Sequence, residues 1–249
     1  RLYSNNPHIA RHFIYQDKGR ILGHMSMLRF YESTWLIQHH ASRTSSHNKA
    51  GLVVLDQIGR MLNDSNRLYS LHMDYVICYY RPDNKFPSRI FGGAAKSIDN
   101  QKECSIDRFA YSHYQHTSRQ MTALPKGWAF SAAKSEDLQE FEDFYEHRSG
   151  GLMLDALDMK ADKFSYDSLD AQYQRAGLSR KRHFYSLKQN GNLKAVIMAV
   201  ISDVGLNLSD LTNCIKVFAI EPEGLAPEVI NTISSFLSQK FKQKEMAIL

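Results

Sequence analysis

The spacing of hydrophobic residues changes along the first quarter of the chain, and each change predicts a new element. Two apolar stretches, 10–15 and 21–30, flank the turn residues Asp17 to Gly19 and predict an antiparallel hairpin. Residues 34–40 have the composition of a buried strand. A polar loop follows at 43–51, and apolar residues then recur at helical spacing as far as Asn63. The pattern therefore predicts hairpin, strand, polar loop and helix.

The next stretch predicts a shorter set of elements. Tyr75–Tyr80 reads as a strong short strand, 86–95 as a short helix or loop containing Gly92 and Gly93, and 104–114 as a final strand or strand pair. The polar run 115–127 follows, and we place a domain boundary within it, between residues 120 and 121.

The second half repeats part of this order. It predicts a strand at 128–132, helices opening at Ser135 and near 168–176, a hairpin of 183–187 with 193–201, a strand at 213–220 and a helix at 227–242. Hairpin, strand, loop and helix thus occur twice, which indicates a tandem repeat of domains 1–120 and 121–249. We expect the first copy to lack its opening helices and the second copy to lack its closing strands.

This order resembles the GNAT-type N-acetyltransferase fold in a tandem arrangement, as in the aminoacyltransferases that build peptidoglycan cross-bridges. The resemblance implies an α/β protein of two tandem acetyltransferase-like domains, each a mixed, mostly antiparallel sheet flanked by helices. In this family the loop after the fourth strand leads into a helix whose first amides hold the pyrophosphate of acetyl-CoA. Ala50 and Gly51 match the end of that loop motif, and Asn48 stands where a glycine is usual.

The resemblance also implies a coenzyme site in the first copy. Its backbone groups in the fourth strand would contact the thioester oxygen, and the loop and helix start would hold the pyrophosphate. The implied residues are Leu36, Ile37, Gln38, Asn48, Lys49, Ala50, Gly51 and Leu52. In the second copy the matching segment, 221–227, carries two carboxylates and two prolines, so we expect that its coenzyme loop is degenerate.

Acyl transfer from a thioester to an amine needs a base and, for the leaving thiolate, an acid. By the resemblance, Glu32 is the candidate base, and Tyr79 and Tyr80 are the candidate acids. His39 and His40 lie near the end of the same strand and must point to opposite faces. A solvated turn for Glu32 and core or rim packing for the tyrosines are the structural alternatives.

Composition narrows the function classes only slightly. The 249 residues carry a net charge of +5, with a pI of about 9.0, which suits an anionic ligand such as a nucleotide or a coenzyme. Three scattered cysteines without a CxxC motif indicate a reducing compartment, so we expect a cytoplasmic protein. No apolar run is long enough for a membrane span, and no metal is expected. The chain begins at Arg1 rather than Met, which is compatible with a fragment of a longer protein.

Three functional hypotheses follow. The first is an acyl-CoA-dependent N-acyltransferase that moves an acyl group from acetyl-CoA or another acyl-CoA to an amine-bearing small molecule or peptide in the cleft between the halves. The second is a non-catalytic binding or regulatory module that uses the same scaffold for a nucleotide or protein partner. The third is an aminoacyl transferase that takes aminoacyl-tRNA, which the net charge permits but does not require. The sequence does not specify the acceptor, the acyl group or the oligomeric state.

Overall fold

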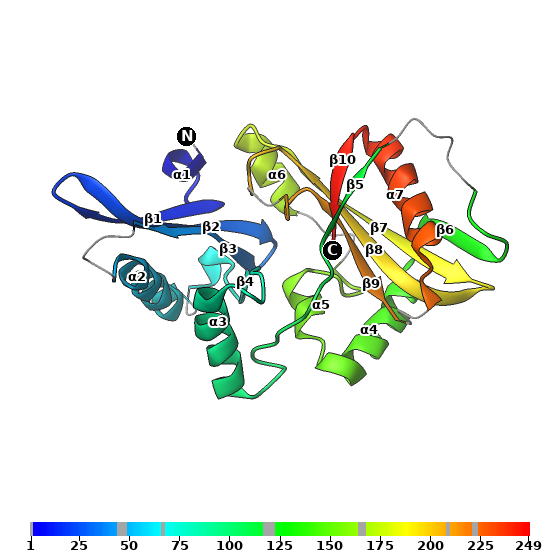
Figure 1. Ribbon diagram of the computed structural model, residues 1–249, viewed down its shortest axis with the longest axis horizontal. Helices are drawn as coiled ribbons and strands as arrows, with labels where there is room; N and C mark the ends of the chain where they lie inside the picture. The colour runs from blue at the N-terminus through cyan, green and yellow to red at the C-terminus, as the bar shows by residue number, and fades with distance from the viewer. Residues whose placement is uncertain are drawn as a thin grey trace. The chain divides into compact units, whose positions relative to one another are not determined.

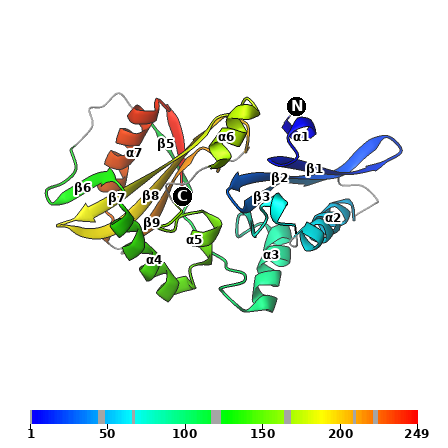
Figure 2. The same ribbon diagram turned by 180° about the vertical axis from the view of Figure 1, so that it is seen from behind.

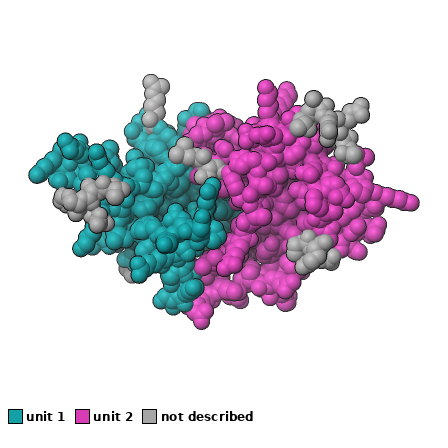
Figure 3. Space-filling model, viewed as in Figure 1, with its two compact units in different colours: residues 1–97, 156–158, 167–177 teal, residues 98–155, 159–166, 178–249 magenta. Residues whose placement is uncertain are grey.

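The fold is α/β, with two mixed sheets flanked by helices, as the sequence predicts (Figures 1 and 2). The computed structural model describes residues 2–43, 49–65, 68–116, 123–163, 168–207, 210–220 and 224–249. The chain forms two compact units (Figure 3). Unit 1 comprises Arg1–Ser97, Ala156–Asp158 and Asp167–Gly177, and unit 2 comprises Ile98–Asp155, Met159–Tyr166 and Leu178–Leu249.

Unit 1 contains a sheet of four strands in the order β1-β2-β3-β4. The predicted hairpin is present as antiparallel β1 and β2, β3 is antiparallel to β2, and β4 is parallel to β3. The strands are β1 (Ala10–Asp17), β2 (Arg20–Tyr31), β3 (Thr34–Ser42) and β4 (Tyr75–Cys78). The helices of this part are α1 (Leu2–Asn5), α2 (Ala50–Ser65), the 3-10 turn η1 (Tyr69–Leu71) and α3 (Lys85–Ile98).

Helix α2 packs against one face of this sheet because its apolar residues recur on one side. The start of α2 comes close to β2 at Gly23, where an added Cβ would lie 3.0 Å from the carbonyl oxygen of Ala50. The Trp35 indole donates a hydrogen bond of 3.1 Å to the Leu71 carbonyl and so ties η1 to β3. The buried core between helix and sheet consists of Met25, Met27, Trp35, Ile37, Val54, Ile58 and Met73.

Unit 2 contains a sheet of six strands in the order β5-β10-β9-β8-β7-β6. Among the strand pairs that the structure describes in this sheet, β9 and β10 are parallel and the others are antiparallel. The strands are β5 (Ser112–Gln115), β6 (Trp128–Ala132), β7 (Arg180–Gln189), β8 (Asn192–Ser202), β9 (Cys214–Ala219) and β10 (Glu245–Ile248), and the helices are α4 (Ser135–Ser149), α5 (Leu152–Ala156) and α7 (Pro227–Phe241).

The two faces of the unit 2 sheet are covered by different helices. Val229, Ile233 and Leu237 of α7 join a buried cluster with β7, β8, β9 and β10. Phe141 of α4 packs on Phe218 of β9, with ring centroids 5.8 Å apart. Phe218 and Ile215 alternate along β9, so α4 and α7 lie on opposite faces.

The two halves of the chain exchange elements. Helix α6 (Ser168–Arg175), from the second half, belongs to unit 1, whereas β5, from the first half, pairs with β10 in unit 2. Unit 1 therefore receives a helix that its own half of the chain lacks. The expectation that the second copy lacks its closing strands is wrong, because β10 and the exchanged β5 close that sheet.

This exchange also bears on the predicted final strand of the first half and on the domain boundary. Of the stretch 104–114, only its end becomes strand, and that strand lies in the sheet of unit 2. The boundary between residues 120 and 121 falls outside the described residues and stays a prediction.

Candidate functional site

The pairing of β3 with β4 ends partway along β3. The two strands pair from Thr34, opposite Tyr75, to Ile37, opposite Cys78. Among the residues that the structure describes, no later pairing joins them, although β3 continues to Ser42 and stays paired with β2. We call this place the strand fork, formed by Gln38–Ser42 of β3 and by residues 79–81 after β4. Backbone groups in a fork of parallel strands can be satisfied by a ligand.

A β-bulge lies in the strand fork. His39 and His40 together stand opposite Met25, between the pairs Ser26–Gln38 and His24–Ala41, and His39 has a φ of +55°. Positive φ is uncommon outside glycine, and it marks the extra residue of a bulge. The bulge takes a residue out of the ladder with β2 and changes which side chains share a face.

The two histidines point to opposite faces, as predicted. The Nδ1 atom of His39 lies 3.3 Å from Ser26 Oγ, on the face away from α2. The Nε2 atom of His40 lies 3.3 Å from the Gly51 carbonyl oxygen, at the start of α2. The His40 ring also stacks on Phe86 of α3, with centroids 5.1 Å apart and planes at 17°. His40 therefore links β3, α2 and α3 beside the fork.

The start of α2 lies against the end of β3. Gly51 is buried, and a Cβ added there would lie 3.1 Å from His40 Nε2 and 3.2 Å from Ser42 Oγ. The Val53 amide closes the first turn by donating to the Lys49 carbonyl. The amides of residues 50–52 stand before that bond, at the end of a helix where amides have no acceptor within the helix. No acidic side chain stands in this first turn. With the helix dipole, these amides favour an anion.

The residues predicted to bind the coenzyme fall into three groups. Leu36 and Ile37 lie inside the paired part of β3, whereas Gln38 is the first residue beyond it. Lys49, Ala50, Gly51 and Leu52 lie at the start of α2, where Lys49 and Leu52 are exposed. Asn48 lies outside the described residues. The structure thus brings the start of α2 and the end of β3 together through Gly51.

The candidate acids lie after β4. Tyr79 and Tyr80 are half-buried, and the Tyr80 hydroxyl would be 3.3 Å from a Cβ added at Gly92 of α3. The Tyr80 ring lies 6.2 Å from that of Phe91. The stretch around Gly92 and Gly93, predicted as a short helix or a loop, is part of the helix α3, and the missing side chain at Gly92 admits the Tyr80 hydroxyl.

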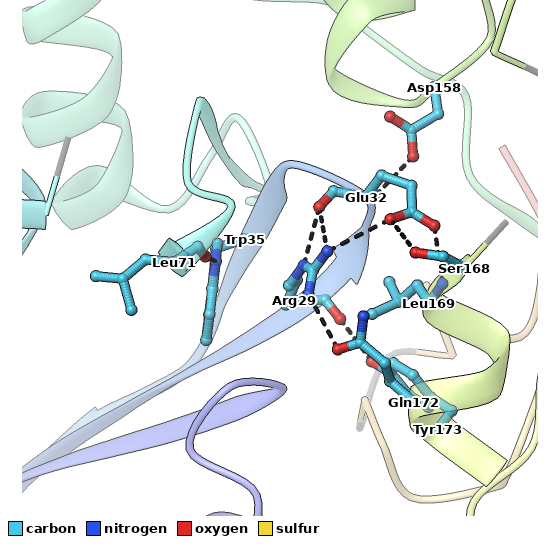
Figure 4. Close-up of polar contacts among 9 residues, drawn as sticks. All are labelled: Arg29, Glu32, Trp35, Leu71, Asp158, Ser168, Leu169, Gln172 and Tyr173. Carbon is cyan, nitrogen blue, oxygen red and sulfur yellow. Dashed lines mark hydrogen bonds and ion pairs between the residues drawn. The ribbon is translucent and has the colours of Figure 1, made fainter. Parts of the chain in front are cut away.

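Glu32 lies in the turn between β2 and β3, and its carboxylate binds the start of α6 (Figure 4). The Leu169 amide donates 2.8 Å to Oε1, and the Ser168 hydroxyl donates 2.9 Å to Oε2. The Glu32 amide donates 2.7 Å to Asp158 Oδ2. Because an anion stabilises the amino end of a helix, this arrangement fixes α6 in unit 1.

Arg29 completes the same cluster. Its side chain is only 1% exposed, and its Nε and Nη2 atoms donate to the Glu32 carbonyl at 2.9 and 2.6 Å (Figure 4). Its Nη1 atom donates 3.1 Å to the side chain of Gln172, and Tyr173 donates 2.7 Å to the Arg29 carbonyl. The cluster therefore joins the β2–β3 turn to α6 through buried hydrogen bonds.

The structure does not bring Glu32 together with Tyr79 and Tyr80. Glu32 precedes β3, whereas the tyrosines lie at the fork beyond Ile37. At about 3.3 Å per residue, a strand of this length separates them by roughly 15 Å. A general base has to lie within hydrogen-bonding reach of its proton, so these positions do not suit one reacting centre. The role of Glu32 as the base stays a prediction.

A histidine cluster on β1, β2 and β3 was missed as a unit by sequence reasoning. The Nε2 atom of His12 lies 3.4 Å from Nδ1 of His24, with ring centroids 5.4 Å apart. Burial, and then the charges of His24 and His12, lower the pKa of His39. Burial and His24 likewise lower the pKa of His12. His24 and Ser26 are two residues apart on β2, which predicts that they share a face of the sheet. The bulge that places His39 on the same face could not be predicted from the sequence.

Two further findings concern the described part of the chain. No helix there is both long and apolar enough to cross a bilayer. Within the same residues, no group of three or more histidine, cysteine, aspartate or glutamate side chains is arranged to hold a metal ion.

Comparisons with known proteins give matches in structure only. No protein-family model and no curated protein sequence matches this chain. A tandem GNAT protein from the clavulanic acid biosynthesis pathway is 10% identical, with 96% of this chain and 73% of that chain covered and a TM-score of 0.39. A GCN5-related N-acetyltransferase-like protein from Streptococcus suis is 6% identical, with coverage of 95% and 76% and a TM-score of 0.39.

A third match is a GCN5-related glucosamine N-acetyltransferase region of a fungal multi-domain β-N-acetylglucosaminidase. It is 12% identical, with 96% of this chain and 30% of that chain covered and a TM-score of 0.44. In both units of the present chain, antiparallel strands lead to a parallel pair with a helix between its two strands. That order is the one that the GNAT resemblance implies, and the chain resembles tandem proteins of the GNAT-type superfamily in architecture.

Proposed function

We propose that this protein is an acyl-CoA-dependent N-acyltransferase and that unit 1 holds the coenzyme. One observation carries the proposal: the strand fork of β3 and β4 lies beside the acid-free start of α2. A fork offers backbone partners to an extended ligand, and a helix start offers amides to an anion. Acyl-CoA carries both kinds of group on one molecule.

The residues fit each part of that ligand. The amides of residues 50–52 and the Lys49 side chain suit the pyrophosphate. The pantetheine arm has amide groups that can pair with β3 beyond Ile37, as an added strand would. Leu36, Ile37 and Gln38 were predicted to contact the thioester oxygen through their backbone groups. Of these three residues, only Gln38 lies within the strand fork.

In the reaction, the amine nitrogen of the acceptor attacks the thioester carbonyl carbon. A C–N bond forms, the C–S bond breaks with its electron pair on sulfur, and the amine gives up one proton. The sulfur leaves as a thiolate and takes up one proton, so that charge and atoms balance. Tyr79 or Tyr80 is proposed to supply the proton to sulfur.

The acceptor is proposed to be an amine-bearing small molecule or peptide. Binding of that acceptor between the two halves of the chain stays a prediction, and so does a cytoplasmic location.

The alternative function, a non-catalytic binding module on the same scaffold, has its own support. The His40 ring already stacks on Phe86 beside the fork, and both carboxylate oxygens of Glu32 accept hydrogen bonds from α6. A scaffold that had lost catalysis would keep such contacts. Its ligand would be a nucleotide or a protein partner.

Thiol release separates the two functions. The protein is incubated with acetyl-CoA and, in turn, glycine, glucosamine, spermidine and a short peptide with a free amino terminus. We expect amine-dependent release of free CoA, detected with a thiol reagent, together with the N-acetylated product by mass spectrometry. Saturable acetyl-CoA binding with no release for any amine would favour the binding module instead.

A further inference from the structure

Two histidines of the β1–β2 hairpin come into contact on the face of the unit 1 sheet that points away from α2. In the ladder, His12 stands opposite Ser26 and His24 stands opposite Ile14, so the two histidines are diagonal neighbours. The residues that follow them in each strand pack in the core beneath α2. Because side chains alternate along a strand, both imidazoles lie on the other face, where diagonal neighbours are within reach of each other.

The two rings turn nitrogen toward nitrogen. Nε2 of His12 lies 3.4 Å from Nδ1 of His24, the ring centroids are 5.4 Å apart, and the ring planes stand at 79°. The nitrogen–nitrogen distance is long beside the roughly 2.7–3.2 Å that is usual for an N–H···O bond. The pair therefore holds two ring nitrogens at one place without a short bond between them.

The same distance fits two ligands of one metal ion. Histidine nitrogens lie about 2.0–2.1 Å from Zn²⁺, and the ligands of a tetrahedral ion stand at about 109°, which places two such nitrogens roughly 3.3–3.4 Å apart. Rotation about the broad χ2 torsion of each ring brings both lone pairs onto one point. A neutral imidazole has one lone pair to give, and its hydrogen then lies on the other nitrogen.

The surroundings leave the pair accessible to an ion from solvent. His12 is exposed and His24 is half-buried. Arg11, beside His12 in the chain, places its guanidinium 5.4 Å from the centroid of the Trp35 ring, on the α2 face, so its charge lies on the other side of the sheet. Tyr3 of α1 adds a ring whose centroid lies 5.3 Å from that of His12.

We propose that His12 and His24 form a two-histidine site for a divalent transition-metal ion such as Zn²⁺, with water at its remaining positions. Imidazole is a ligand that suits Zn²⁺, and no third protein ligand is assigned. The site goes beyond the proposed function and does not depend on it. It departs from the expectation, drawn from the sequence, that no metal binds. Because its two ligands come from neighbouring strands, the bound ion ties β1 to β2.

The test is a Zn²⁺ titration of the full, tag-free chain at pH 7.5, after metals have been removed with a chelator. Imidazoles with an ordinary pKa near 6.5 are neutral at this pH, as metal ligands have to be. On the 15N-labelled protein, we expect the imidazole signals of His12 and His24 to shift together with one midpoint; His12→Gln and His24→Gln assign these signals. In calorimetry, each variant should bind Zn²⁺ at least about tenfold more weakly than the unmodified protein.

His147 provides the matched control. It is an exposed histidine of α4 in unit 2, and its Nδ1 atom lies 2.7 Å from the Asp143 carbonyl oxygen. His147→Gln should leave the Zn²⁺ affinity unchanged, and the His147 signals should stay in place when the pair is saturated. Hydrogen exchange gives a second measurement: Zn²⁺ should slow the exchange of β1 amides in the unmodified protein but not in His12→Gln.

The outcomes decide between a metal site and a plain contact of two rings. Unchanged Zn²⁺ affinity in His12→Gln and His24→Gln, or signals of the pair that do not respond to Zn²⁺, would overturn the proposal and leave a hydrogen bond between neutral imidazoles. Weak binding of several ions, reduced equally by His147→Gln, would also overturn it, because scattered surface histidines would then explain the binding. Failure of acetyl-CoA to bind would leave this site standing, so the two proposals fail separately.

Discussion

Units 1 and 2 share a strand order but differ where a GNAT-like domain would hold its coenzyme. In unit 1, β3 bulges at His39 and runs on past its pairing with β4. In unit 2, β9 also continues past the residues that its ladder with β10 joins, Cys214 and Ile215, but it pairs with β8 from Cys214 to Ala219 without a shift of register. The same architecture thus has a bulged strand at the parallel pair in one copy and a regular strand in the other.

The helices that follow these two strands, α2 and α7, also differ in their first turns. Helix α2 starts with Ala50 and Gly51 and has no acid in its first turn. Helix α7 starts with Pro227, which has no amide hydrogen, and carries Glu228 in its first turn. A carboxylate there repels an anionic ligand. The comparison shows that two units with the same strand order differ at a strand and at the helix after it, and we propose that only unit 1 retains a ligand site there.

The largest expected effect concerns the cluster that fixes α6 in unit 1. Replacing Arg29 with Met leaves the Glu32 carbonyl and the Gln172 side chain without their buried donor. We expect a loss of about 3 kcal/mol in the free energy of unfolding, measured with urea. Hydrogen exchange should show faster opening of α6 than of β8 in unit 2.

A matched control for Arg29 is available on α2. Arg60 forms an exposed ion pair with Asp56, so Arg60→Met should change stability by less than about 0.5 kcal/mol. Equal losses in both variants would show that the cluster around Glu32 does not hold α6.

The next largest effect concerns the start of α2. Leu52 is 45% exposed, so Leu52→Glu adds a carboxylate beside the amides of the first turn without disturbing the core. We expect acetyl-CoA to bind at least about tenfold more weakly, because the added charge repels the pyrophosphate. Calorimetry measures the change.

Two controls sharpen this comparison between the units. Leu52→Gln has nearly the same shape without the charge and should bind acetyl-CoA as the unmodified protein does. Glu228→Gln removes the acid from the first turn of α7 in unit 2 and should leave the affinity unchanged. If Glu228→Gln created a second acetyl-CoA site, the negative charge of Glu228 would by itself be the reason why unit 2 does not bind the coenzyme.

A smaller effect is expected at the tyrosines after β4. Replacing both Tyr79 and Tyr80 with Phe should lower turnover by about tenfold, since a thiolate leaves readily without full protonation. Acetyl-CoA affinity should stay the same. Tyr185→Phe is the control in unit 2, because the buried Tyr185 hydroxyl has no hydrogen-bond partner among the residues that the structure describes. Unchanged turnover in the double variant would remove both tyrosines from the mechanism.

Most of the fold followed from local patterns. The hairpin of β1 and β2, the helix α2 and the hairpin of β7 and β8 were predicted from alternation, helical spacing and the turns at Gly19 and Gly191. The short strand β10 was missed because its residues, Glu245–Ile248, lack clear alternation and follow a helix directly. The exchange of α6 and β5 depends on tertiary pairing, which no local pattern encodes.

The candidate site was less predictable than the fold. The start of α2 was predicted from the composition of the loop before it. Leu36 and Ile37 were predicted to contact the coenzyme, but both lie in the part of β3 that is paired with β4. The carboxylate of Glu32 was expected to face a substrate, whereas it binds the start of a helix that lies about 136 residues later in the sequence. A contact across that separation leaves no signal in residue spacing.

The smallest effect is a dependence of stability on pH. The folded pKa values of His12, His39, His72 and His183 are lowered from 6.5, in each case chiefly by burial. The unfolded chain therefore binds more protons below pH 6.5, and stability falls as the pH drops from there through the folded pKa values. Thermal unfolding between pH 7.5 and 5 measures this fall. His39→Gln should make it shallower for unit 1, and His183→Gln for unit 2; an increase in stability toward pH 5 would contradict the assignment.

The most direct test of the central claim is a calorimetric titration of the full chain with acetyl-CoA. The claim is that only unit 1 retains a coenzyme site, at the strand fork and the start of α2. We predict saturable binding of one acetyl-CoA per chain, weakened by Leu52→Glu and preserved in Leu52→Gln. No saturable heat, or two equivalent sites per chain, would contradict the account.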